Sequence, residues 1–207
     1  MIVDALLKKY PIISDQVTVR ELRVLLYELE KQLQAGKAQN IVELGCYVGT
    51  TSLFVSRLLN AYHFTGAFHV YDSFAGLPPK TVQDNSVAGD QFVAGALHAP
   101  RKVFVENFKK AGVRPPVIHK AWFSELNVND IPENVSFAFF DGDYYESVKD
   151  SFRVVTPRLT PNAVVVVDDY ASEALPGAAQ ATNEWATAHG LRVQSQASLG
   201  IIRLSDK

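Results

Sequence analysis

Five carboxylates follow apolar runs that are typical of buried strands, and they are the side chains of this 207-residue sequence best suited to chemistry. Glu43, Asp72, Asp141, Asp168 and Asp169 each lie at or just after the end of such a run. In an open α/β sheet, ligands bind beyond the carboxyl ends of the strands. We therefore expect the five acids to share one rim of a sheet and to face a ligand.

A glycine turn follows the first of these strands. Residues 40–52 read Asn-Ile-Val-Glu-Leu-Gly-Cys-Tyr-Val-Gly-Thr-Thr-Ser, so Gly45 and Gly49 precede a predicted helix start at Thr50. Glycine tolerates positive φ and lets a ligand approach the backbone, and a helix N-terminus offers unpaired N–H groups. Tyr47 stands where a dinucleotide fold needs a glycine beside the pyrophosphate. The stretch favours a phosphate-free nucleoside ligand such as S-adenosylmethionine, and a tight turn without a ligand is the alternative.

Further candidate cofactor contacts follow the next two strands. Asp72 ends the strand predicted at residues 67–72, where an acid can accept hydrogen bonds from both ribose hydroxyls. Trp122 follows a short strand at residues 116–120 and either stacks on an adenine ring or belongs to the core. The predicted cofactor-binding residues are Glu43, Gly45, Tyr47, Gly49, Thr50, Asp72, Ser73, Trp122 and Asp141.

The remaining strand-end acids indicate a metal site. Asp141, Asp168 and Asp169 would repel one another unless a cation compensates them. Carboxylate ligands without His or Cys favour a hard ion, Mg²⁺ before Ca²⁺ or Mn²⁺. Such an ion would orient a substrate hydroxyl and lower its pKa. The alternative is that Asp168 and Asp169 only cap a turn while Asp141 is solvated, and the residues alone leave both open.

The elements that must position these residues alternate between strand and helix. A capping box at Thr18 and Glu21 begins an amphipathic helix that ends at Gly36. Strands are predicted at 40–44, 67–72, 116–120, 135–140 and 163–167, helices at 50–59, 100–112, 148–159 and 178–189, and a closing antiparallel hairpin from 191–194 and 199–204. This order predicts one α/β domain over residues 1–207, with helices on both faces of a mostly parallel sheet and an N-terminal helical segment at 1–39.

Residues 80–99 lack a clear period and are rich in Gly, Asp, Asn, Gln and Ala. Loops of this length inside a compact domain are commonly lids or disordered segments. We expect a long mobile loop that contributes to the acceptor site. His98 is its one obvious acid or base.

Composition narrows the function and the location. A net charge of −2, with 47% hydrophobic and 20% charged residues, provides no basic field for nucleic acid. No apolar run approaches the roughly 20 residues of a membrane span. The single cysteine, Cys46, cannot form an intramolecular disulfide, and residues 1–9 lack a signal-peptide layout, so we expect a cytoplasmic protein. A homo-oligomer is compatible with the sequence.

Several motifs together resemble one family. They are V-E-L-G-C-Y-V-G-T-T-S from Val42, Y-D-S-F-A-G-L-P from Tyr71, F-x-E-N-F from Phe104, D-G-D-Y-Y-E-S-V from Asp141 and V-V-D-D-Y from Val166. With them the chain resembles the macrocin O-methyltransferase family of class I S-adenosylmethionine-dependent methyltransferases. The resemblance covers most of the chain. It implies a Rossmann-like sheet of seven strands, with Glu43, Gly45 and Asp72 around the cofactor and Mg²⁺ on Asp141, Asp168 and Asp169.

The resemblance also implies a reaction, methyl transfer to a hydroxyl of a small molecule such as a sugar of a natural-product glycoside. Catechol-type methyltransferases have a lysine where this chain has Tyr144, so the base stays open between Asp143, His98 and a hydroxide on the metal, with Asp141 beside them. Three rival functions remain from the sequence. They are a nicotinamide-dependent oxidoreductase, a methyltransferase-like domain that binds cofactor without turnover, and a metal-dependent hydrolase.

Overall fold

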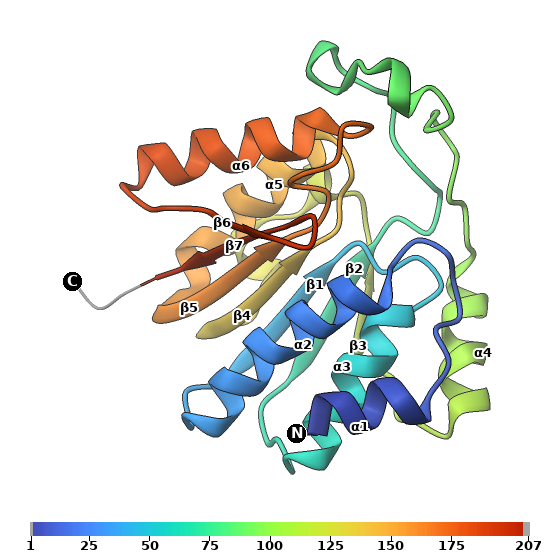
Figure 1. Ribbon diagram of the computed structural model, residues 1–207, viewed down its shortest axis with the longest axis vertical. Coiled ribbons are helices and arrows are strands. Elements are labelled where there is room, and N and C mark those ends of the chain that lie inside the picture. The colour runs from blue at the N-terminus through green and yellow to red at the C-terminus, as the bar shows by residue number, and fades with distance from the viewer. Residues whose placement is uncertain (1, 205–207) are drawn as a thin grey trace.

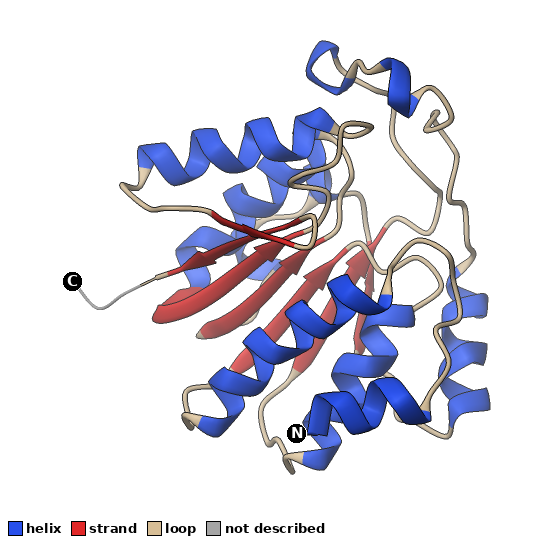
Figure 2. Ribbon diagram, in the orientation of Figure 1, coloured by secondary structure: helices blue, strands red, loops and turns tan. Residues whose placement is uncertain are grey.

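A seven-stranded sheet runs through the middle of the computed structural model, which describes residues 2–204 (Figures 1 and 2). The strands are β1 (Asn40–Leu44), β2 (Phe68–Asp72), β3 (Val117–Lys120), β4 (Val135–Phe140), β5 (Leu159–Val167), β6 (Gln194–Gln196) and β7 (Leu199–Arg203). Their order is β3-β2-β1-β4-β5-β7-β6. β1 to β5 pair in parallel, and β7 is antiparallel to both β5 and β6. The predicted fold class is confirmed.

Helices cover both faces of the sheet (Figure 2). They are α1 (Ile2–Lys9), α2 (Val19–Gln34), α3 (Thr50–Ala61), α4 (Arg101–Ala111), α5 (Tyr145–Val155) and α6 (Pro176–Ala188). Short 3-10 turns lie at Val82–Asp84, Val87–Gly89, Phe123–Glu125, Val128–Asp130 and Thr156–Arg158. Within residues 2–204, no helix is long and apolar enough to cross a membrane.

Side-chain alternation along each strand divides the interior into two apolar cores. On β1, Ile41 packs into the core shared with α1, α2 and α3, whereas Val42 and Leu44 pack into the core beneath α5 and α6. The order in which the chain adds strands reverses between β1 and β4: β2 and β3 are added on one side of this pair, and β5 is added on the other. Such a switch point leaves a crevice beyond the strand ends, which is where ligands bind in open α/β sheets.

The predicted start of α2 is confirmed, and two other boundaries are corrected. Thr18 Oγ1 accepts from the N–H of Glu21, and the Glu21 carboxylate accepts from the N–H of Thr18. The helix predicted at 148–159 ends at Val155, because Pro157 lies in the next turn and cannot continue the helix. The strand predicted at 163–167 begins earlier, at Leu159, as β5.

The closing hairpin is tighter than the apolar pattern predicted. β6 consists of exposed polar residues, Gln194–Gln196, rather than of residues 191–194. The turn is the pair Ala197 and Ser198, with φ of 52° and 71°. Positive φ at both central residues matches the two-residue hairpin turns whose twist suits the flanking strands. Because neither residue is Gly, Asn or Asp, the usual sequence signal was missing.

Candidate active site

A cavity of about 400 Å³ opens beyond the carboxyl ends of β1 and β4. Most of the residues predicted to do chemistry line it: Gly45, Tyr47, Asp72, Ser73, Trp122, Asp141, Asp143 and Asp169. They come from the loops after β1, β2, β3, β4 and β5, which parallel pairing brings to one rim of the sheet. The volume lies within the range of small-molecule sites.

Asp72 holds the glycine turn in place. One carboxylate oxygen accepts from the backbone N–H groups of Cys46 and Tyr47, at 2.8 and 3.0 Å, and the other accepts from the N–H of Phe74 at 2.7 Å. An ionised carboxylate has about four acceptor directions. Three bonds therefore leave acceptor capacity for a ligand hydroxyl, so Asp72 can support the turn and bind a ribose at the same time.

Backbone geometry explains the glycine and the tyrosine of this turn. Gly45 has a φ of 95°, and a Cβ added there would lie 1.8 Å from the backbone oxygen of Asp141. Tyr47 has a φ of 45°, in the left-handed region that side chains other than glycine seldom adopt. Such outliers gather at binding sites, where the surrounding structure holds them. The close approach of Gly45 to Asp141 joins the β1 and β4 loops into one wall.

The amides of Gly45, Cys46, Tyr47 and Gly49 are not free to form a phosphate cradle. The N–H of Gly45 donates to the carbonyl of Tyr71 at 2.9 Å, and the N–H of Gly49 donates to that of Cys46 at 2.7 Å. The N–H groups of Cys46 and Tyr47 are held by Asp72. Phosphate sites at such turns need free backbone donors. The turn therefore fits a phosphate-free nucleoside better than a dinucleotide.

Glu43, Gly49 and Thr50 support the turn from behind and are not part of the cavity lining. Glu43 is 2% exposed and accepts a 2.6 Å hydrogen bond from Ser52 Oγ on α3. Gly49 precedes α3, and a Cβ there would lie 2.8 Å from the Phe104 ring. Thr50 Oγ1 and Ser14 Oγ are 2.9 Å apart. Strand parity explains Glu43, because its side chain points to the opposite face from Val42 and Leu44.

The aspartates that follow β4 and β5 are buried or half-buried and repel one another. Burial, followed by the charges of Asp168, Asp143 and Asp169, raises the pKa of Asp141 well above its usual value. Burial, followed by the charge of Asp169, likewise raises the pKa of Asp143 and of Asp168. Burial, followed by the charge of Glu21, raises the pKa of Asp169 to about 6. The pattern is that of carboxylates lacking a nearby cation.

Cation partners are missing from this cluster within residues 2–204, since no ion pair there involves Asp141, Asp143, Asp168 or Asp169. Nor do any three His, Cys, Asp or Glu side chains in that range already stand close enough to hold a metal ion. Asp168 is 8% exposed, is not part of the cavity lining, and accepts from the N–H of Asp169 at 2.9 Å. The oxygen-only donor set fits a hard cation in its chemistry, and binding one requires these side chains to draw together.

The two predicted base candidates lie in different places. Asp143 lines the cavity and has a φ of 59°, which turns its backbone sharply just before α5. His98 is exposed near the end of the loop that precedes α4, and it is not part of the cavity lining. The structure thus brings Asp143, but not His98, into one cavity with the glycine turn.

An N-terminal wall closes the cavity from the side opposite α5, and it was not among the predicted site residues. Asp15, Gln16, Thr18 and Glu21 all line the cavity. Oε1 of Glu21 also accepts from Ser198 Oγ, on the closing hairpin, at 2.5 Å. Short polar residues ahead of a helix are ordinary capping signals, so their types and spacing do not by themselves indicate a ligand.

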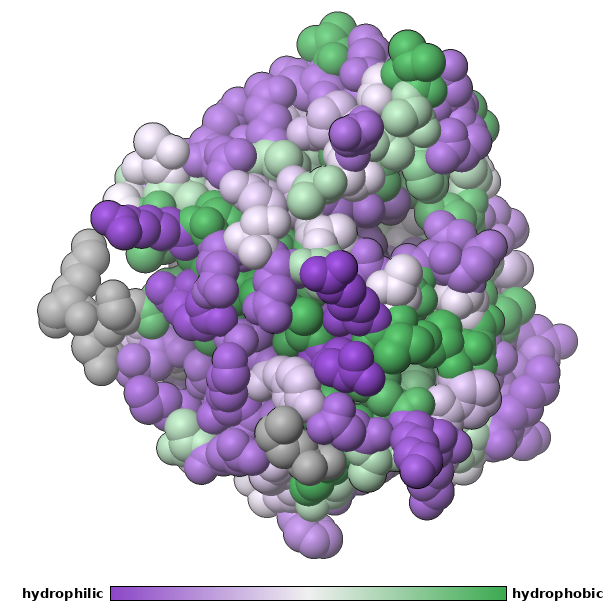
Figure 3. Space-filling view, viewed as in Figure 1, coloured by the Kyte–Doolittle hydropathy of each residue, from purple (hydrophilic) through white to green (hydrophobic). Residues whose placement is uncertain are grey.

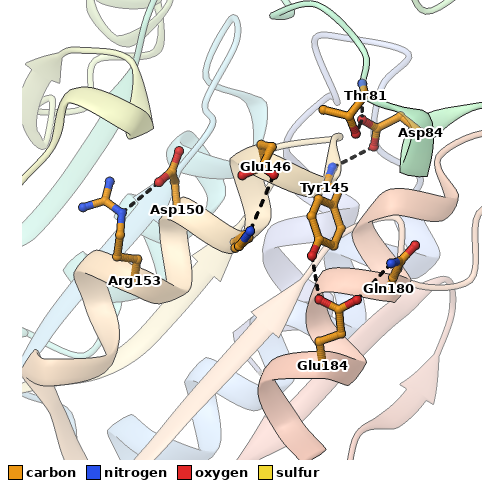
Figure 4. Close-up of polar contacts among 9 residues, drawn as sticks. Thr81, Asp84, Tyr145, Glu146, Asp150, Arg153, Gln180 and Glu184 are labelled. Carbon is orange, nitrogen blue, oxygen red and sulfur yellow. Dashed lines mark hydrogen bonds and ion pairs between the residues drawn. The ribbon is translucent and has the colours of Figure 1, made fainter. Parts of the chain in front are cut away.

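Residues 80–99 arch over the strand ends and are tied to the body of the molecule (Figure 1). Asp84, which is fully buried, accepts from the N–H of Tyr145 at 2.7 Å, and its other oxygen accepts from Thr81 (Figure 4). A Cβ on Gly177, in α6, would lie 1.9 Å from Asp84 Oδ1. Two 3-10 turns and this anchor replace the unstructured loop that was expected. We call residues 76–99 the lid.

Removing the lid anchor has a predictable cost. Asp84→Ala leaves the buried N–H of Tyr145 without its acceptor and releases Thr81. We expect the free energy of unfolding to fall by about 1–3 kcal/mol. We also expect faster proteolysis between residues 80 and 99. Urea unfolding and limited digestion measure the two effects. Asp90→Asn, at an exposed acid of the same segment, is the matched control, and equal digestion of both variants would contradict the anchor.

Glu43 makes stability depend on pH. Burial raises the pKa of its carboxyl to about 8, against the opposing effect of the Ser52 hydrogen bond. An unfolded chain ionises Glu near 4.3. Between these values the unfolded state loses a proton that the folded state keeps, so the free energy of unfolding falls as pH rises. We expect Glu43→Gln to reduce that fall between pH 5 and pH 8 by roughly 3 kcal/mol. Urea unfolding at several pH values measures this. An equal fall in the free energy of unfolding for the variant and the wild type would contradict the prediction.

Comparison with known proteins agrees with the resemblance. The macrocin-O-methyltransferase (TylF) family model matches residues 13–197. The 8-demethyl-8-(2,3-dimethoxy-alpha-L-rhamnosyl)-tetracenomycin-C 4'-O-methyltransferase of Streptomyces olivaceus is 29% identical over 164 residues, 76% of this chain. The match spans 63% of that protein, so the chain covers less than two thirds of its length.

A second relative and a solved structure extend the comparison. The mycinamicin III 3''-O-methyltransferase of Micromonospora griseorubida is 25% identical over 191 residues, covering 88% of this chain and 74% of that protein. The solved structure of the O-methyltransferase NovP shares the fold, with a TM-score of 0.78 at 18% identity over 91% of this chain and 81% of that one. By the extent of the family match, the chain belongs to the macrocin-O-methyltransferase family.

Proposed function

We propose that this protein transfers a methyl group from S-adenosylmethionine to a hydroxyl of a small molecule, a sugar of a natural-product glycoside. The observation that carries the proposal is the cavity that the glycine turn shares with Asp141, Asp143 and Asp169, within the family match. The named relatives, which act on rhamnosyl-tetracenomycin and on mycinamicin, support the glycoside class.

The cofactor is proposed to lie along the rim from β1 to β3. Asp72 would accept the ribose hydroxyls, Gly45 and Tyr47 would contact the methionine part, and Trp122 would lie against the adenine, with Ser73 next to Asp72. Four backbone N–H groups of the turn already donate to Asp72 or to carbonyls and are not available to phosphate oxygens. This supports a ligand without phosphates at this point. Glu43, Gly49 and Thr50 then act on the cofactor only through the turn that they support.

Mg²⁺ is proposed as the cation of the acidic cluster, with Asp141, Asp168 and Asp169 as the residues that would hold it. Their burial, their mutual repulsion and their oxygen-only chemistry support this assignment. When bound, the ion supplies positive charge that keeps the surrounding carboxylates ionised and that orients and acidifies the substrate hydroxyl.

The chain itself aligns the reactants and takes the proton. The walls of the cavity hold the sulfonium methyl in line with the acceptor oxygen, and such positioning supplies much of the acceleration. As the new C–O bond forms, the C–S bond breaks and its electron pair stays on sulfur, which leaves S-adenosylhomocysteine. The hydroxyl proton passes to the Asp143 carboxylate, the one base candidate in the cavity lining. The lid excludes water that would compete for the site.

Turnover with methyl-labelled S-adenosylmethionine on a panel of glycosides and phenols, with Mg²⁺ or with EDTA, tests this proposal. We expect label on a sugar hydroxyl and a requirement for the cation. Cofactor binding without transfer to any acceptor would favour a domain that binds but does not turn over. Tighter binding of NAD than of S-adenosylmethionine would favour the oxidoreductase.

A further inference from the structure

One motif of the sequence, F-x-E-N-F at residues 104–108, lies outside the cavity lining. It belongs to α4, which follows the end of the lid directly after Pro100. Phe104 and Phe108 are fully buried and Asn107 is half-buried. Figure 3 shows mainly hydrophilic surface at the right-hand rim of the molecule, where Figure 1 places α4. The two rings and the asparagine therefore form the inner side of this helix.

Asn107 holds the glycine turn from outside the cavity. Its side-chain amide donates from Nδ2 to the backbone carbonyl of Val48 at 2.9 Å. Val48 lies between Tyr47 and Gly49, whose φ values are 45° and 89°. Fixing this carbonyl fixes the plane of the peptide that joins Val48 to Gly49, because the peptide unit is rigid. The turn is thus held at two amides by Asp72 and at a carbonyl by Asn107.

The two phenylalanine rings support the same turn. Phe104 and Phe108 stack with their centroids 4.8 Å apart. A Cβ on Gly49 would lie 2.8 Å from the Phe104 ring and 3.4 Å from the Phe108 ring, so a larger residue would push the turn away from the helix. This close packing brings α4 near enough for Asn107 to reach the Val48 carbonyl.

Phe104 also contacts the turn that follows β2. Its ring meets the Phe74 ring edge-on, with centroids 6.2 Å apart and an interplanar angle of 71°. Phe74 has a φ of 53°, and its N–H donates to Asp72 at 2.7 Å. Both turns around Asp72 therefore contain a non-glycine residue in the left-handed region, Tyr47 in one and Phe74 in the other. Such conformations persist only where surrounding contacts hold them, and α4 supplies contacts to both turns.

We propose that Asn107 is a positioning residue for the cofactor, because its amide keeps the glycine turn in the conformation that receives S-adenosylmethionine. Phe104 and Phe108 set the separation between α4 and the turn that this hydrogen bond requires. Asn107 is not part of the cavity lining, so it acts on the cofactor only through the turn. The inference rests on the proposed function and adds to it a residue outside the binding cavity.

Two variants remove the amide donor and keep the approximate size of the side chain. Asn107→Leu adds no charge, and Asn107→Asp adds one. Titration calorimetry uses S-adenosylhomocysteine, which has no net charge, so that a new carboxylate does not attract it as it would attract the cationic methyl donor. We expect both variants to bind this product about three- to tenfold more weakly. We also expect the KM for S-adenosylmethionine to rise while kcat stays within about twofold.

The two variants must agree. Weaker binding by Asn107→Asp alone would show an effect of charge and would overturn the inference. Unchanged affinity in both variants would overturn it as well.

Two control variants on α4 separate positioning of the turn from stability of the helix. Val105→Gly removes an exposed side chain from the middle of α4 and weakens the helix. Glu106→Gln removes an exposed charge that pairs with Lys102 at 3.7 Å. We expect both controls to keep the wild-type affinity for S-adenosylhomocysteine. An equal loss of affinity in Val105→Gly would mean that Asn107 acts through helix stability, which would contradict a positioning role.

Amide hydrogen exchange distinguishes failure of this inference from failure of the proposed function. If the wild-type chain does not bind S-adenosylhomocysteine, the proposed cofactor is wrong. The exchange rates of the Cys46 and Tyr47 amides in the free protein then decide the role of Asn107, because these amides stay bonded to Asp72 only while the turn keeps its conformation. Faster exchange in both Asn107 variants than in the two controls would sustain the inference, and equal rates in all four would overturn it.

Discussion

Changing both Asp168 and Asp169 to asparagine is expected to abolish methyl transfer, by roughly 100-fold or more, while the affinity for S-adenosylmethionine changes little. The physical reason is that the two carboxylates would hold the cation, whereas Asp72 and the glycine turn would hold the cofactor on neighbouring strands. Turnover with labelled cofactor measures the first effect, and titration calorimetry measures the second.

Stability distinguishes this result from misfolding. Burial raises the pKa of both aspartates, and so does a neighbouring carboxylate, Asp169 for Asp168 and Glu21 for Asp169, so neutral amides of the same size should fold at least as well. The acceptor oxygen that bonds the N–H of Asp169 is retained in asparagine at position 168. Asp90→Asn is again a matched control. Loss of cofactor binding in parallel with activity would refute separate sites for the cation and the cofactor.

Replacing Asp72 by alanine is expected to have the reverse pattern and to weaken cofactor binding about 100-fold, roughly 3 kcal/mol. The change removes the acceptor of three backbone N–H groups, those of Cys46, Tyr47 and Phe74, as well as the proposed ribose acceptor. The turn then loses the contact that holds Tyr47 in its left-handed conformation. Calorimetry with S-adenosylmethionine measures the loss directly.

Asp72→Asn is the conservative companion. Its one amide oxygen retains either the bond to the turn or the bond to Phe74, so an intermediate affinity is expected. Urea unfolding of both variants shows how much of the effect comes from the turn itself. Unchanged cofactor affinity in Asp72→Ala would remove this residue from the ribose site.

The sequence predicted the parts of the site that local rules determine. Runs such as Val135–Phe140 are apolar on both faces because the strand is buried on both faces, and their carboxyl ends place Asp72, Asp141 and Asp169 on one rim. Gly45 was predicted from its place in a strand-to-helix turn, and the 1.8 Å approach to Asp141 gives the reason for it. These features depend on chain direction and strand parity, which a sequence carries.

Other features depend on contacts between distant segments, which a single sequence does not display. Asp84 is buried because the N–H of Tyr145 lies opposite it, 61 residues further along the chain. Asp15 lines the cavity because the connection between α1 and α2 crosses the strand ends. Glu43 is a different case: it was expected to face the ligand with the other four acids, but it lies on the same face of β1 as Ile41 and therefore points toward α3 and away from the rim.

Electron density from a crystal grown with S-adenosylhomocysteine and Mn²⁺, an anomalous scatterer that stands in for Mg²⁺, tests the central claim most directly. We predict the ribose on Asp72, the homocysteine part beside Gly45 and Tyr47, and one anomalous peak among Asp141, Asp168 and Asp169. Cofactor bound outside the β1 turn, or a well-ordered cofactor with no peak at these three aspartates, would contradict the account.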